Sequence, residues 1–228
     1  MLRHSQGTYT KGPGGTAGQD KYVGDFVAGK KHGKGEYSYT DKSVYVGDFG
    51  FGMRSGAGVL KHANGDAYDG QWKNGVQQGE GTFTWANGDA YDGEWAGGNP
   101  VGKGSMTRSR QKGTDQTACF AEGDWEGGVI TEGKVMFPNG DVYTGELAKK
   151  GMRHGEGTYM WEDTGEYDGC FIGGSMEGKA DYTSHNGNTL QALFVHGQVD
   201  ETKPMKKKQL EKNKKKEKDE EPVPVENA

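Results

Sequence analysis

One phrase, Asn-Gly-Asp-Ala-Tyr-Asp-Gly, occurs at residues 64–70 and returns unchanged at residues 87–93. The same spacing of 23 residues separates four successive tyrosines, Tyr22, Tyr45, Tyr68 and Tyr91. Self-similarity at a fixed period indicates a repeat architecture, in which each unit buries its apolar face only against its neighbours. Because this periodicity restricts the possible folds more than any other feature, we interpret the chain unit by unit.

The sequence of each unit predicts two β-strands, because apolar and polar residues alternate in it with a period of two. In the unit that begins at Tyr68, the side chains of Tyr68, Gly70 and Trp72 fall on one face of a strand, and polar side chains fall on the other. A second strand with the same alternation follows around Gly81. The loop between the two strands, residues 73–78, contains the turn signal Asn74-Gly75. The pattern is typical of an antiparallel sheet with one solvated face.

The spacing also predicts a strand register in which large rings lie beside glycines, because glycines leave room for the rings. Within the hairpin, the expected pairs are Trp72 with Gly79, Gly70 with Gly81, and Tyr68 with Phe83. Across the next loop, residues 86–90, the expected pairs are Trp85 with Tyr91, Phe83 with Gly93, and Gly81 with Trp95. Glycine normally weakens a strand, so its repetition at these places indicates a steric need for bare backbone.

The signature of the array is an aromatic residue, a glycine and a second aromatic residue in the first strand of each unit. We expect these residues to form the interaction face, because a one-layer sheet leaves aromatic area partly exposed and exposed apolar patches usually mark interfaces. They are Tyr22, Gly24, Phe26, Tyr45, Gly47, Phe49, Tyr68, Gly70, Trp72, Tyr91, Gly93, Trp95, Gly123, Trp125, Tyr143, Gly145, Tyr167, Gly169 and Phe171.

The composition favours an open sheet over a compact core. The chain has 228 residues, of which 42 are glycine, and its mean hydropathy is -0.96. We therefore predict an all-β fold: an elongated, single-layer, twisted antiparallel β-meander of about seven hairpin repeats across residues 22–200. Residues 1–21 supply a capping strand and a glycine-rich loop. Residues 107–119 form an insertion, and Ala121 and Thr131 stand at signature positions after it, so we expect an uneven sheet over 107–135.

The last segment, residues 201–228, differs in composition from the repeats. It contains nine lysines and seven acidic residues, whereas the repeat body is acidic. Without an apolar stripe, the segment is expected to be a disordered tail or a solvated helix. Three roles stay open for it: a solubilising tail, a segment that docks on a partner, and a contact with anionic lipid.

The residues give no support to catalysis, a metal site or a cofactor. His32 and His154 occupy the same place in different repeats, which is typical of surface loops, and Cys119 and Cys170 share no metal-ligand spacing with a histidine pair. The Asn-Gly-Asp phrases are explained by turns rather than by calcium. An acidic body disfavours nucleic acid. No apolar run is long enough for a membrane helix and no signal peptide is evident, so we expect a cytosolic protein.

The aromatic–glycine–aromatic signature, a glycine-bearing turn and a second strand with Gly-x-Gly, at 23-residue spacing, resemble the MORN (membrane occupation and recognition nexus) repeat. The resemblance covers residues 22–196, with departures at Ala121, Thr131, Leu147 and Ala180. Within that family, a stand-alone array with a short charged tail is most similar to the radial-spoke-head proteins of cilia and flagella. Residues 153–159 and 163–167 are similar to that subgroup.

The resemblance implies a non-catalytic scaffold that binds other protein subunits of a large assembly, with self-association possible. It favours a subunit of the axoneme, in the radial spoke head, and hence a location in the cytoskeleton of a cilium or flagellum. The alternatives are a tether at a membrane that binds acidic phospholipids, and a cytoskeletal adaptor outside cilia.

Overall fold

The computed structural model describes residues 4–11, 19–109, 120–200 and 206–207. These residues form antiparallel β-structure, and the one helical element among them is the short 3-10 turn η1 (Lys149–Gly151). The all-β meander predicted from the periodicity is therefore confirmed. The chain divides into two compact units, residues 1–138 with 147–151 and residues 139–146 with 152–228, which we describe separately.

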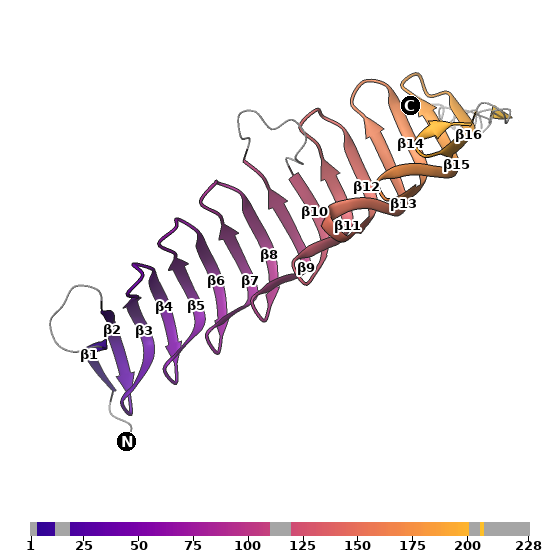
Figure 1. Ribbon diagram of the computed structural model, residues 1–228. Helices are drawn as coiled ribbons and strands as arrows, with labels where there is room; N and C mark the ends of the chain where they lie inside the picture. Colours follow the sequence, from indigo (N-terminus) through magenta and orange to yellow (C-terminus); the bar gives the residue numbers. More distant parts are fainter. Residues whose placement is uncertain (1–3, 12–18, 110–119, 201–205, 208–228) are drawn as a thin grey trace, which may run out of the picture. The chain divides into compact units, whose positions relative to one another are not determined.

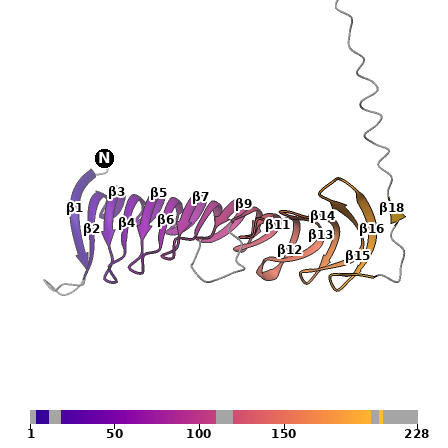
Figure 2. The same ribbon diagram turned by 90° about the horizontal axis from the view of Figure 1, so that it is seen from above.

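The first unit is a series of strands, each antiparallel to the next one along the chain (Figures 1 and 2). The predicted capping strand at Gly7 is the first of them. The strands are β1 (His4–Lys11), β2 (Asp20–Val27), β3 (Lys30–Ser38), β4 (Val44–Gly50), β5 (Met53–Lys61), β6 (Ala67–Lys73), β7 (Val76–Thr84), β8 (Ala90–Ala96), β9 (Asn99–Thr107), β10 (Phe120–Glu126) and β11 (Val129–Met136).

The second unit has the same construction. It contains β12 (Val142–Ala148) as far as Glu146, then β13 (Met152–Trp161), β14 (Gly165–Ile172), β15 (Ser175–Ser184), β16 (Thr189–Val195), β17 (Gln198–Val199) and β18 (Lys206–Lys207). Strands β13 to β16 pair in chain order. Both β17 and β18 pair with β16, so the charged segment returns to the sheet at Lys206. The rest of the predicted tail and residues 110–119 of the insertion lie outside the described residues.

In the first unit, hairpin turns of two residues join the strands within a repeat. At Asn74-Gly75 both residues have positive φ, 52° and 86°. Positive φ at both central positions is the mark of a type I′ turn, whose twist matches that of the flanking strands. The turn signal is therefore confirmed, but the loop is shorter than predicted, because β7 starts at Val76. Phe51-Gly52 makes the same turn in the preceding hairpin, with φ of 53° and 93°.

The strand register agrees with the sequence for one half of the hairpin and differs for the rest. Tyr68 lies opposite Phe83 and Gly70 opposite Gly81, as expected. The register then shifts, and Trp72 lies opposite Gln77 rather than Gly79. Gly79 has a φ of +69°, so it sits in a left-handed bulge that the simple alternation does not reveal.

The register across the following loop was predicted wrongly by two residues. The observed pairs are Phe83 with Tyr91, Gly81 with Gly93, and Gly79 with Trp95. The reason is the loop itself. The Trp85 amide donates to the Asp89 carbonyl at 2.9 Å, which closes a loop of residues 85–89 and ends β7 at Thr84. Phe83 therefore faces the ring of Tyr91 and Gly81 faces Gly93, whereas Trp95 still faces a glycine.

This register lines up one glycine from every strand of the first unit. Each glycine is the direct cross-strand partner of the next, and we call the set the glycine row. It consists of Gly7, Gly24, Gly35, Gly47, Gly58, Gly70, Gly81, Gly93, Gly104, Gly123 and Gly133. In the second unit, Gly157 lies opposite Gly169 and Ala180 opposite Ala192.

Candidate interaction surface

The signature tyrosines lie across the glycine row. A Cβ added at Gly81 would meet the hydroxyl and ring of Tyr68, which explains why the row has no side chains. The Tyr68 hydroxyl donates to the backbone carbonyl of Gln71 at 3.1 Å, and the equivalent bond recurs in other repeats, such as Tyr45 to Asp48 at 2.9 Å. Burial, together with the Asp69 carboxylate, raises the pKa of Tyr68 to about 12.

The rings form an edge-to-face ladder that extends from Phe26 to Trp125 in the first unit and from Tyr143 to Phe194 in the second. Tyr68 contacts Trp72 of its own repeat and Trp95 of the next, with ring centroids 5.0 and 5.1 Å apart and near-perpendicular planes. The Trp72 indole N–H donates to the carbonyl of Gly58 in the glycine row at 2.8 Å, and Trp95 does the same with Gly81. Edge-to-face geometry is the preferred arrangement of aromatic pairs, so neighbouring repeats are held by rings and hydrogen bonds together.

The signature aromatics are therefore core residues, and the expectation that their rings are partly exposed is wrong for all but one. Tyr22, Tyr45, Tyr68, Tyr91, Tyr143, Tyr167 and Phe171 have no exposed surface, and Phe49, Trp72, Trp95 and Trp125 are buried; Phe26 is partly exposed. The signature glycines Gly24, Gly47, Gly70, Gly93 and Gly123 belong to the glycine row, and Gly145 and Gly169 lie against Gly157. These residues support the surface from the interior of the sheet, so a binding partner would contact other side chains.

Exposed apolar side chains gather instead at the hairpin turns, a feature that sequence reasoning missed. We call them the turn row: Phe51, Met53, Val76 and Val129 in the first unit, and Met152, Ile172 and Val195 in the second. Phe51 is 78% exposed and stands in the type I′ turn itself. The sequence carries a signal for this row, since each member lies within two residues of a turn glycine.

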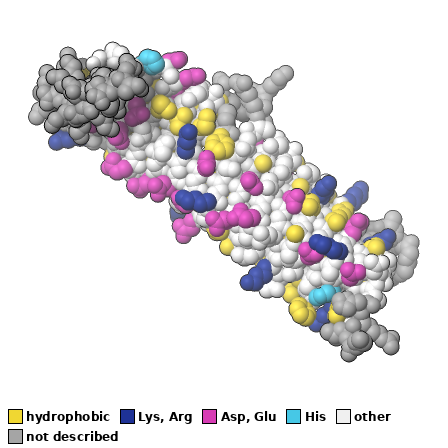
Figure 3. All heavy atoms as spheres, turned by 180° about the vertical axis from the view of Figure 1, so that it is seen from behind, with side chains coloured by type: hydrophobic (Ala, Val, Ile, Leu, Met, Phe, Trp, Pro, Cys, Tyr) yellow, Lys and Arg dark blue, Asp and Glu magenta, His cyan; other side chains and the backbone are white. Residues whose placement is uncertain are grey.

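The opposite face of the strands is polar and mainly acidic, as predicted. Asp69, Asp92 and Glu122 occupy the position between the signature aromatic and the signature glycine, and all three are exposed. Figure 3 shows groups of acidic side chains with fewer lysines and arginines among them. Two exposed ion pairs cross this face in the first unit, Lys34 with Asp48 at 2.8 Å and Lys103 with Asp124 at 2.6 Å.

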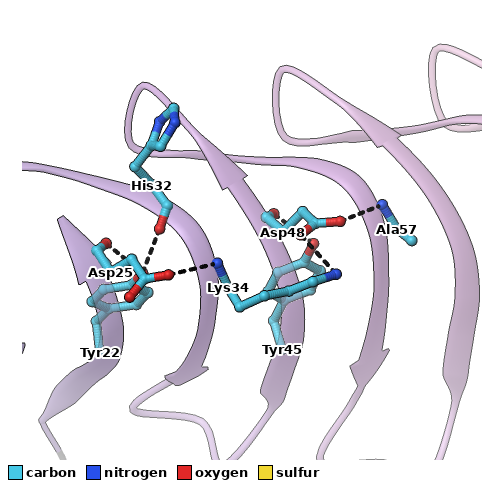
Figure 4. Close-up of polar contacts among 7 residues, drawn as sticks. All are labelled: Tyr22, Asp25, His32, Lys34, Tyr45, Asp48 and Ala57. Carbon is cyan, nitrogen blue, oxygen red and sulfur yellow. Dashed lines mark hydrogen bonds and ion pairs between the residues drawn. The ribbon is translucent and has the colours of Figure 1, made fainter. Parts of the chain in front are cut away.

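Some of these carboxylates accept hydrogen bonds from backbone amides. Figure 4 shows Asp25 accepting a hydrogen bond from the Lys34 amide, at 3.3 Å, and Asp48 accepting one from the Ala57 amide, at 3.2 Å. Both amides come directly after the bulge glycine of their hairpin, where the normal ladder is interrupted. In these two hairpins, the acidic residue that follows the signature glycine therefore satisfies an amide at the bulge.

The aspartate of each Asn-Gly-Asp phrase connects one loop to the next. Asp66 accepts from the Ala86 amide at 2.8 Å, and Asp89 accepts from the Ser109 amide at 2.9 Å. In the second unit, Asp141 is buried and accepts from the Tyr159 hydroxyl at 2.6 Å and from the Glu162 amide at 3.2 Å. Burial opposes the charged form, but these bonds and one from Asn139 prevail and lower the pKa of Asp141.

The described residues contain no cluster of His, Cys, Asp and Glu side chains able to hold a metal ion. His32 and His154 contribute their backbone carbonyls, which accept from the hydroxyls of Tyr22 and Tyr143 at 3.4 and 3.2 Å. Cys170 is a free thiol, and Cys119 lies outside the described residues. Among those residues, no helix has the length and apolar character needed to cross a membrane.

The departures at Ala121 and Thr131 compensate each other in one respect. Where other repeats use a tyrosine hydroxyl to bind the carbonyl three residues later, the Thr131 hydroxyl donates to the Asp124 carbonyl at 3.2 Å. The sheet stays regular around it, because Gly123 pairs with both Gly104 and Gly133. The predicted irregularity over 107–135 is therefore confined, within the described residues, to a bulge beside Thr131.

The comparisons with known proteins bear on the repeats. The family model of the MORN repeat matches residues 22–44, 45–67, 68–90, 91–110, 143–165 and 167–189. It does not match the hairpin at β10 and β11, although that hairpin continues the glycine row. No curated protein sequence matches the chain.

Two solved structures share a general likeness. One is the TCP domain of Drosophila melanogaster SAS-4 (dCPAP) in complex with a proline-rich motif of Ana2, at 13% identity and a TM-score of 0.36, with 77% of this chain and 84% of that chain covered. The other is the TCP10 domain of Danio rerio CPAP with a STIL peptide, at 11% identity and a TM-score of 0.43, covering 88% and 99%. Similarity this low carries no argument about function. The six family matches span more than half of the sequence, and the chain therefore belongs to the MORN-repeat family.

Proposed function

We propose that the chain is a non-catalytic scaffold that binds other proteins through its turn row. MORN repeats are associated with protein-interaction and membrane-binding scaffolds, and the family is generally non-catalytic. One observation carries the proposal. Apart from Phe26, the rings of the aromatic ladder are buried, whereas the apolar side chains of the turn row are exposed. Exposed apolar side chains that gather in one place are typical of protein interfaces.

The assembly that we propose is the ciliary or flagellar axoneme, with the radial spoke head as the first candidate. The support comes from the sequence: an array of MORN repeats, a charged segment after it, and residues 153–159 and 163–167. A fluorescently tagged full-length chain in a ciliated cell is expected to stay with the axoneme after the membrane is removed. Its presence at non-ciliary membranes alone would contradict this location.

The turn row can be tested without disturbing the core. We expect the combined change Phe51→Asn, Met53→Gln and Val76→Thr to lose the proteins that co-purify with the tagged full-length chain. A control changes Val23→Thr and Val46→Thr, apolar residues that are 44% and 52% exposed on the other face. The control should keep its partners, and both variants should keep the same circular dichroism. Retention of every partner by the turn-row variant would contradict the proposal.

The charged segment favours one alternative, a tether that binds acidic phospholipid, because residues 203–218 contain nine lysines. Flotation with vesicles of phosphatidylserine and phosphatidylcholine separates the two functions. A tether would float at low salt and would sink at high salt or when residues 203–218 are removed. A chain that never floats supports the protein scaffold.

A further inference from the structure

The hairpin of β10 and β11 lacks the ring that the other repeats of the first unit place on the glycine row. Ala121 stands where the sequence period puts a tyrosine, between Met106 and Val135 as cross-strand partners. At Gly81 or Gly104, the atoms nearest to an added Cβ belong to a tyrosine ring, whereas at Gly133 the nearest atoms are backbone atoms of residues 122 and 123. Trp125 contacts Tyr91 with centroids 5.0 Å apart, but the partner ring of its own repeat is missing.

The Thr131 hydroxyl replaces only the polar part of that tyrosine. By donating to the Asp124 carbonyl, it satisfies the group that a tyrosine hydroxyl binds in other repeats. The volume of the ring is not restored. The structure has a cavity of about 390 Å³ here, whose apolar lining includes Met106, Ala121, Trp125, Ile130, Val135 and Phe137, with Val129 of the turn row. An engineered apolar cavity of roughly 150 Å³ is enough to bind benzene, so this one has room for an aromatic side chain.

The edge of the cavity carries positive charge on an otherwise acidic array. Arg108 and Lys150 line it, and both are exposed. The 110–119 segment, which connects β9 to β10, has no aromatic and no branched aliphatic residue that could fill an apolar cavity. An occupant that matches this lining has an apolar ring for the cavity and a carboxylate for the two cations.

We propose that the cavity at Ala121 binds a phenylalanine-like side chain of a partner protein, with an acidic group beside the ring. The Asp124 carbonyl already has a donor in Thr131, so the occupant needs no hydroxyl. This inference builds on the scaffold function, because it gives one repeat a specific anchoring site.

Three small probes test the site in the full-length chain: N-acetyl-phenylalanine, its amide, and N-acetyl-alanine. Methyl resonances of Ala121, Ile130 and Val135 report binding. We expect N-acetyl-phenylalanine to bind most tightly, the uncharged amide about tenfold more weakly, and N-acetyl-alanine not to shift these methyl resonances. The double change Arg108→Gln and Lys150→Gln should remove the difference between the acid and the amide. Equal binding of the alanine compound would overturn the proposal.

Ala121→Tyr is the decisive variant, because it restores the residue of the other repeats. It should abolish probe binding while its melting temperature equals or exceeds that of the unchanged protein. Ala121→Leu, which fills the cavity with a smaller group, provides the same test if the tyrosine variant does not fold. Undiminished binding to a folded variant refutes the site. If no probe binds while the turn-row variant still loses its partners, the cavity proposal fails and the scaffold function stands.

Discussion

At Gly81 the array has no space for even one additional carbon atom. A methyl group there would collide with the ring of Tyr68, which is fully buried and fixed by Trp72 and Trp95. We expect Gly81→Ala to destabilise the protein by about 1–3 kcal/mol, the usual result of overpacking a filled core. Urea unfolding followed by tryptophan fluorescence measures the loss.

The second unit shows how the chain adapts to a methyl group at an equivalent place. Ala180 faces Gly169, and the register shift there begins one residue earlier, between Asp168 and Cys170. Gly81→Ala is therefore expected to break the pair with Gly70 rather than to unfold the repeat. Glu80→Ala, on the exposed face next to it, is the control and should change stability by less than about 0.5 kcal/mol. An equal effect of both changes would refute the steric explanation.

Asp141 gives the second unit a dependence on pH. Its pKa is lowered in the folded state, so its contribution is present above the unfolded value of about 4 and disappears as the pH falls through the lower folded value. Asp141→Asn should cost about 1.5–3 kcal/mol at pH 7, the scale of hydrogen bonds to a charged group. The difference from the unchanged protein should shrink as the pH falls below about 4.

The matched control is Asp163→Asn, an exposed aspartate in the loop after β13. It should leave the unfolding free energy unchanged at both pH values. A penalty for Asp141→Asn that is the same at pH 7 and at acid pH would show that the carboxylate charge has no part in the loop contacts with Tyr159 and Glu162.

At the scale of the element, the turn at Phe51 keeps an apolar ring exposed at a cost in stability. Phe51 has a φ of +53°, a left-handed conformation that costs bulky residues energy, and its ring is 78% exposed. Asn74 occupies the same position in the next turn, where asparagine is favoured. Phe51→Asn is expected to stabilise the protein by about 0.5–1 kcal/mol, measured as a higher urea midpoint.

The reciprocal change, Asn74→Phe, should destabilise the protein by a similar amount, since it repeats the conflict one turn further along. If Phe51→Asn instead destabilises the chain, the contact of Phe51 with His32, whose ring centroids lie 6.2 Å apart, outweighs the backbone cost. A gain in stability combined with a loss of partners would indicate that the exposed ring is used for binding.

The hairpins and their turns follow from the sequence period, but the burial of the rings does not. Alternation correctly predicts that Tyr68, Gly70 and Trp72 share a face. It does not show the left-handed bulge at Gly79, which shifts the register, and so it misplaces the cross-strand partners. The rings are buried within a single layer because they lie along the glycine row, a three-dimensional arrangement that a two-face pattern does not describe.

The site at β10 and β11 shows a second limit. Considered alone, Ala121 and Thr131 each resemble degenerate positions of the repeat. Only the structure shows that the threonine hydroxyl takes over the bond of the absent tyrosine, at 3.2 Å from the Asp124 carbonyl. Compensation between two strands leaves no mark in a single sequence.

At the scale of the whole molecule, stability is built from contacts between neighbours. In the first unit every β-pairing joins strands that follow one another in the chain, from β1 to β11. Proteins of this kind behave as a sum of repeat and interface terms. Each added hairpin contributes its own rings and also covers the tyrosine of the hairpin before it, as Trp95 covers Tyr68.

Fragments of the first unit test this additivity. A chain of residues 1–84, which ends with β7, should fold, and a chain of residues 1–107, which adds β8 and β9, should fold with a higher urea midpoint. Trp72→Ala in either fragment removes the ring between Tyr45 and Tyr68 and should cost about 3–5 kcal/mol. A single core shared by all strands would instead leave both fragments without sheet circular dichroism. Equal midpoints would show that the added hairpin contributes nothing to its neighbour, and the ladder would then not be the source of stability.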